Sequence, residues 1–94
     1  EQYESARQAA ERALVLSQQD GYPAPVARSY QLLSAIATSQ QQYANALQFG
    51  QRAFDSARKA KDVSAPNYAV NVGNMFFDRG QYQQAVPYFT YGVA

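Results

Sequence analysis

The side chains that carry acid–base, nucleophilic and metal chemistry are scarce in this chain of 94 residues. It has no histidine and no cysteine, so the commonest general base at neutral pH and every thiolate are missing. A serine nucleophile would find no histidine to accept its proton. The carboxylates Glu1, Glu4 and Glu11 lie on one expected helix with Asp20 near its end, at the spacing of a solvated surface. With no phosphate-binding loop and no metal-ligand spacing, the sequence predicts no enzyme, no cofactor and no metal site.

Charge and hydropathy narrow the class of partner further. Eight basic and seven acidic residues leave a net charge of +1, which would not attract nucleic acid or an anionic membrane. The longest apolar runs, such as residues 13–16, are far too short to span a bilayer. We therefore expect no nucleic-acid binding and no membrane insertion, and turn to the elements that shape the surface.

Helical periodicity runs through the whole chain. Alanine and glutamine favour helices, and no stretch alternates apolar and polar residues as a strand would. Gly21 suits a left-handed residue after a helix end, Ser64 suits an N-cap with Pro66 in the first turn, and Gly80 interrupts a helix. The sequence thus predicts an all-α fold of about five helices, over residues 2–19, 24–40, 43–60, 66–79 and from 81 onward.

An internal repeat organises these helices. The pair Tyr43 and Ala46, spaced as Tyr-x-x-Ala, recurs 39 residues later as Tyr82 and Ala85, and another copy opens at residue 3. Between the copies a second pattern recurs at the same offset. It is Tyr30-x-x-Leu33-Ser34-x-x-Ala37 and then Ala69-x-x-Val72-Gly73-x-x-Phe76. Each repeat is therefore expected to be a pair of antiparallel helices that must stack on its neighbours.

On these residues the chain resembles the tetratricopeptide repeat family, whose pattern joins a large-x-x-Leu-Gly-x-x-Tyr helix to an Ala-x-x-x-Phe helix. Residues 69–89 look like a near-complete copy, whereas the middle unit has Ser34 for the glycine and Gly50 for the aromatic residue. The resemblance implies one domain over 1–94: a second helix of a partial repeat at 1–20, a repeat at 24–61, and a repeat at 65–94 truncated at its end. Repeats of about 40 residues are similar to those of bacterial regulators and sensors.

The small and aromatic residues of the last unit also predict how its helices pack, independently of the family resemblance. Gly73 and Ala85 would let the two helices of one hairpin touch closely, with Tyr82 and Phe89 filling the space beyond and Phe76 packing between units. Pro87 lies inside the fifth helix and would be tolerable facing solvent. The tyrosines at 88 and 91 would pack either on a following helix, which we favour, or around a ligand.

The resemblance implies a right-handed solenoid in which the first helix of each unit lines a concave groove. Eight residues are predicted for that groove: Arg28, Gln31, Thr38, Asn67, Asn71, Asn74, Phe77 and Asp78. Their asparagines would bind the backbone of an extended peptide, and the aromatic ring would accept an apolar group. The alternative is an ordinary solvated helix face. A carboxylate clamp of the kind found in some family members is not expected, since Leu32 replaces an arginine and the lysine positions are not basic.

Two functions follow. The leading prediction is a non-enzymatic scaffold that binds a protein or peptide partner in the groove. The alternative is a structural or oligomerisation segment of a larger sensor or regulator, because helices without capping neighbours leave apolar surface that favours homo-oligomers. An enzyme subdomain is the weakest reading, because the reactive side chains are missing.

Overall fold

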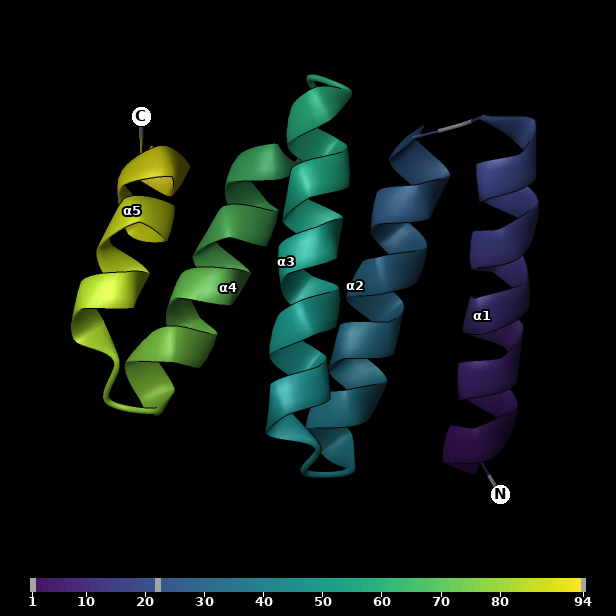
Figure 1. Ribbon diagram of the computed structural model, residues 1–94, viewed down its shortest axis with the longest axis horizontal. Helices are drawn as coiled ribbons and strands as arrows, with labels where there is room; N and C mark the ends of the chain where they lie inside the picture. The colour runs from purple at the N-terminus through teal and green to yellow at the C-terminus, as the bar shows by residue number, and fades with distance from the viewer. Residues whose placement is uncertain (1, 22, 94) are drawn as a thin grey trace.

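The computed structural model describes residues 2–21 and 23–93, which form five α-helices and no strand. The helices are α1 (Gln2–Asp20), α2 (Pro23–Ser39), α3 (Tyr43–Lys59), α4 (Ala65–Asp78) and α5 (Tyr82–Val93). They stand side by side in chain order and alternate in direction (Figure 1). The predicted all-α fold is confirmed, and the predicted helix limits fall within one residue of the observed ones.

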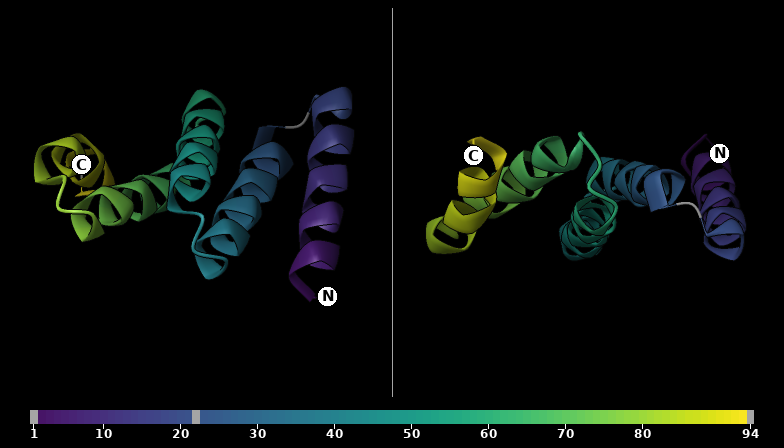
Figure 2. Two further views of the ribbon diagram at one scale, coloured as in Figure 1. Left: turned by 60° about the horizontal axis from the view of Figure 1, so that its bottom comes forward. Right: turned by 90° about the horizontal axis from the view of Figure 1, so that it is seen from above.

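The helices pair into hairpins that stack along the chain. The contacts are most extensive between α2 and α3, which form the first hairpin, and between α4 and α5, which form the second hairpin. Further contacts join α1 to α2 and α3 to α4. Seen from above, α2 and α4 lie on one side of the row and α3 lies on the other (Figure 2, right). The Cα atoms fill a flat block of 34 × 30 × 14 Å. The structure therefore offers one broad face to which α2 and α4 both contribute.

Helix ends follow the same repeat as the helices. Gly21 and Lys61 follow the first and third helices with φ of 75° and 55°, and Gln41 and Gly80 follow the second and fourth with φ of 62° and 76°. In the turns after the second, third and fourth helices, the residue that follows the left-handed one donates its N–H to a carbonyl five residues earlier, as in Gln42 to Ala37 at 2.8 Å. This is the Schellman arrangement, which satisfies carbonyls at a helix end.

Small residues bring the helices together. Ala27 of α2, Ala57 of α3 and Ala65 of α4 form one buried cluster, in which no side chain exceeds a methyl group. A second cluster joins Phe54 of α3 to α4 and α5, and includes Ala69, Val72, Phe76 and Ala85. Because the inner surfaces consist largely of methyl groups, the helix axes can lie close and the hairpins nest.

The glycine and alanine predicted to form the closest contact are both buried, with Gly73 and Ala85 facing into the second hairpin. The ring of Phe89 lies directly over Gly73, since a Cβ atom built there would lie 2.7 Å from it. Tyr82 departs from expectation. It is 58% exposed and packs on Phe77 at the surface, so it does not fill the hairpin interior.

Three further expectations meet the structure with different results. Ser64 occupies the predicted N-cap position, but its hydroxyl makes no capping bond, and its backbone N–H donates to Asp62 Oδ1 at 2.8 Å. Tyr91 packs backward, with its ring 4.9 Å from that of Phe54 in α3, so a following helix is not needed to explain it. Pro87 is exposed, as its tolerance in α5 requires.

Candidate functional site

A polar stripe runs along one side of α4. It consists of Asn67, Asn71, Asn74 and Asp78, whose spacing of four, three and four residues places them on one side of the helix. All are exposed except Asn71, which is half-buried. The equivalent positions of α2, 39 residues earlier, hold Arg28, Leu32, Ala35 and Ser39. These positions therefore hold mostly amides on α4, whereas on α2 they hold one charged, two apolar and one hydroxyl side chain.

The seam between α2 and α4 is lined by the next stripe of α2. Ala27 opens this stripe among Ala65 and Tyr68 of α4. One turn later, the side-chain oxygen Oε1 of Gln31 is buried and has no hydrogen-bond partner in the described part of the chain. A buried acceptor without a donor destabilises a protein by about 1–3 kcal/mol. Gln31 of α2 thus holds a buried acceptor without a partner among the residues described.

The seam ends in a cavity of about 330 Å³ at the C-terminal ends of α2 and α4. Residues of three helices surround it: Thr38 of α2, Tyr43 and Ala46 of α3, and Met75, Asp78 and the adjoining Arg79 of α4. The Thr38 hydroxyl already donates to the backbone oxygen of Ser34 at 3.0 Å. The inner wall is consequently apolar, and the charges lie on two exposed residues.

The structure brings some of the predicted groove residues together and separates others. Thr38 and Asp78 line the same cavity, although they come from different helices. Arg28 instead lines a hollow of about 430 Å³ between α1 and α2. Phe77 is directed toward the last helix, with its ring 4.9 Å from that of Tyr82. The surface between α2 and α4 therefore includes fewer residues than the eight predicted for the groove.

The cavity contains residues that sequence reasoning missed, notably Tyr43, Met75 and Arg79. A signal for them was present in the sequence. Gly50 stands where the repeat pattern has an aromatic residue, and a Cβ atom added there would lie 3.3 Å from the Met75 methyl group. Met75 therefore extends from α4 into space that the missing ring leaves open.

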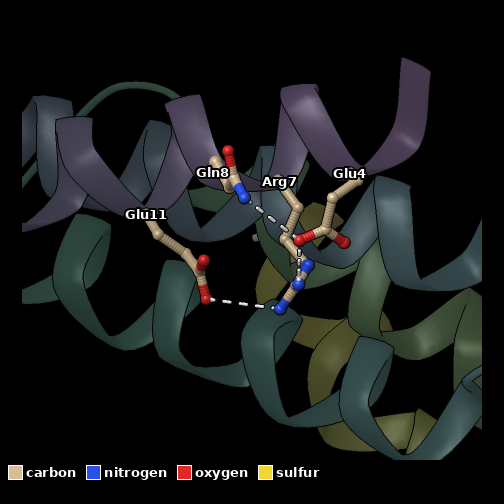
Figure 3. A network of polar contacts seen from close by, with 4 residues as sticks. All are labelled: Glu4, Arg7, Gln8 and Glu11. Atoms are coloured by element: carbon tan, nitrogen blue, oxygen red, sulfur yellow. Dashed lines mark hydrogen bonds and ion pairs between the residues drawn. The ribbon is translucent and has the colours of Figure 1, made fainter. Parts of the chain in front are cut away.

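Ionic contacts are confined to the surface and lie away from this face. On α1, Arg7 donates to Glu4 and lies 3.8 Å from Glu11, while Gln8 donates to Glu4 at 3.3 Å (Figure 3). The hydrogen bond from Arg7 to Glu4 raises the pKa of the guanidinium above its usual value, which leaves it charged throughout the working pH range. This network fits the solvated surface predicted for the acidic residues of α1.

Metal binding and membrane crossing find no support in the described residues. No three acidic, histidine or cysteine side chains lie close enough together to hold an ion within residues 2–21 and 23–93. None of the helices in these ranges combines the length and the apolar character that crossing a bilayer requires.

Comparison with known families gives a match for the first hairpin. A family model for the tetratricopeptide repeat matches residues 26–60, which include most of α2 and all of α3. No curated protein and no solved structure matches the chain. The match falls on the unit whose pattern is the weaker of the two, and the second hairpin repeats its helices at the same offset. Residues 26–60, little more than a third of the chain, are thus similar to a tetratricopeptide repeat.

Proposed function

We propose that the chain is a non-enzymatic scaffold that binds an extended peptide segment of a partner protein across α2 and α4. Tetratricopeptide repeats are in general protein-interaction modules, which supports a scaffold role. The observation that carries the finer proposal is the row of asparagines along one side of α4, of which Asn67 and Asn74 are exposed. The side-chain oxygen of Gln31 on α2 is buried without a hydrogen-bond partner in residues 2–21 and 23–93, and a peptide N–H could pair with it if the side chain turned outward on binding.

The spacing of the stripe suits an extended backbone. A helix rises 1.5 Å per residue, so Asn67 and Asn71 lie about 6 Å apart along the axis. Two residues of an extended chain span about 6.6 Å. The step from Asn67 to Asn71 therefore matches two residues of a peptide that runs along the helix, whereas the step from Asn71 to Asn74, about 4.5 Å, matches between one and two residues. Each side-chain amide can both donate and accept, and such a peptide leaves its backbone N–H and C=O groups free for it.

The charge of the face favours a peptide over a nucleic acid. The amide stripe contains no cation and ends in the carboxylate of Asp78, which would repel a phosphate backbone. Binding through neutral amides depends little on ionic strength, in contrast to phosphate binding. The expected partner is a backbone held by hydrogen bonds, with its side chains selecting among sequences.

A peptide-display selection against the chain tests this proposal. Peptides that bind should lose affinity when Asn71 and Asn74 are both replaced by alanine, by roughly tenfold if each lost bond contributes about 0.5–1.5 kcal/mol. Asn45→Ala is the matched control, because it removes an exposed asparagine from α3. Selected peptides that bind the double variant as tightly as the wild type would rule out the α2–α4 face.

A second candidate function, self-association, rests on exposed apolar side chains on the outer helices. Val15 and Leu16 of α1 are 51% and 54% exposed, and Val86 of α5 is 58% exposed. We infer that these surfaces join copies of the chain at high concentration. Sedimentation at several concentrations should then show a rising average mass, which Leu16→Gln should reduce. A constant monomer mass would exclude this role.

A further inference from the structure

We propose that the cavity at the end of the α2–α4 seam receives an aromatic side chain of the bound peptide. This inference rests on the proposed function and deepens it, because it states which side chain the partner must carry. It comes from comparing the two hairpins of this chain position by position, at the offset of 39 residues that relates them.

The second hairpin shows what occupies this place when aromatic residues are present. There, Phe77 packs edge to face on Tyr82 with ring centroids 4.9 Å apart, and Phe89 lies 6.4 Å from Phe77. Edge-to-face pairs of this kind are favourable beyond the area they bury. The second hairpin therefore joins three rings at the point where its helices turn.

The first hairpin retains one of those three rings. Tyr43 occupies the position of Tyr82, but Thr38 replaces Phe77 and Gly50 replaces Phe89. Met75 fills the space above Gly50, and the space above Thr38 remains open as part of the 330 Å³ cavity. The cavity thus lies where the chain's own second repeat places a phenyl ring.

Size and chemistry both suit an aromatic ring. An apolar cavity of about 150 Å³ already accommodates benzene, so a phenyl group fits with room for the adjoining peptide backbone. Tyr43 offers a ring for an edge-to-face contact, and the thioether of Met75 packs well on aromatic rings. Asp78 and Arg79 line the cavity with opposite charges, so a neutral side chain is favoured over a charged one.

Met75 is the only methionine in the chain, which makes it a specific reporter. Protein labelled with ¹³C at the methionine methyl group gives one signal, and N-acetyl-phenylalaninamide should shift it upfield to saturation through the ring current. We expect N-acetyl-alaninamide to bind about tenfold to a hundredfold more weakly. An unmoved signal, or equal binding of both compounds, would overturn the assignment.

Two variants locate the ring in the cavity. Thr38→Phe copies the second hairpin, so it should shift the Met75 signal upfield without ligand and abolish the titration, whereas Asn45→Phe on the other side of α3 should leave the titration intact. Tyr43→Leu should weaken binding severalfold while preserving the fold, because this tyrosine is 54% exposed. Titration at wild-type affinity in folded Thr38→Phe or Tyr43→Leu protein would overturn the assignment.

The failure of this inference is distinguishable from failure of the proposed function. If selected peptides depend on Asn71 and Asn74 but leave the Met75 signal unmoved, the cavity assignment is wrong and the groove stands. If N-acetyl-phenylalaninamide titrates but a selected peptide with phenylalanine binds no tighter, the cavity accepts free aromatic compounds and the peptide assignment is wrong. A peptide that binds more tightly and shifts the same signal supports both.

Discussion

Adding one methyl group to each of two buried helical glycines should have opposite effects on stability. Gly50 of α3 and Gly73 of α4 are both buried, and alanine is favoured over glycine in a helix interior by about 0.8–1.0 kcal/mol. The two sites differ in what the new Cβ atom meets. At Gly50 it would lie 3.3 Å from the flexible end of Met75, whereas at Gly73 it would lie 2.7 Å from the ring of Phe89.

These distances decide the sign of the effect. A methionine methyl group can move by a few tenths of an ångström, so Gly50→Ala should retain most of the gain in helix propensity and stabilise the chain by about 0.5–1 kcal/mol. The Phe89 ring must move as a whole, and overpacking of a core destabilises by about 1–3 kcal/mol. Gly73→Ala should therefore lie between neutral and about 2 kcal/mol destabilising after the gain is subtracted.

Urea unfolding followed by circular dichroism measures both variants on the same scale. The difference between them should be roughly 1–3 kcal/mol, and replacing Phe89 by leucine in the Gly73→Ala background should recover part of it. Equal stabilisation by the two alanines would refute the close approach of α4 and α5. A Gly73→Ala variant unaffected by the size of residue 89 would refute the assignment of the clash.

The remaining predictions concern the turns, the seam and the first hairpin. Lys61→Gly should raise stability by about 0.5–1 kcal/mol, because a left-handed conformation strains lysine. Gln48→Gly is the control: it lies in the middle of α3 and should lower stability by about 1 kcal/mol. Thermal unfolding of both variants checks the sign of each effect. Gln31→Leu should stabilise the free chain by about 1–2 kcal/mol in urea unfolding and weaken every selected peptide; a variant that keeps full peptide affinity would contradict the role of this oxygen. Ser34→Ala should lose about 1 kcal/mol in the same assay, because the buried hydroxyl donates to Ala46 O at 2.7 Å.

Much of the architecture could be predicted from local signals. Gly21 and Gly80 follow helix ends, Pro66 lies in the first turn of α4, and the spacing of tyrosine and alanine reveals the two hairpins. The left-handed residues at Gln41 and Lys61 were harder to foresee, since neither type favours that conformation. The repeat accounts for them, because Gln41 and Lys61 occupy the positions that Gly80 and Gly21 occupy in the neighbouring units.

The candidate site was predicted less completely, because helical position alone does not say which neighbour a side chain faces. Asn67, Asn71 and Asn74 lie on one side of α4, and their role in a groove stays a prediction. Phe77 shares the helix but contacts α5, and Arg28 lines the hollow beside α1. The cavity itself depends on Met75 reaching across to Gly50, a contact between two units that no pattern within one unit contains.

Chemical-shift mapping of a selected peptide on the ¹⁵N-labelled chain tests the central claim most directly. If the peptide lies across α2 and α4, the largest changes should occur at the side-chain amides of Gln31, Asn71 and Asn74, with little change in α1. Changes centred on the outer surface of α1 or α5, with these three amides unmoved, would contradict the proposed binding face.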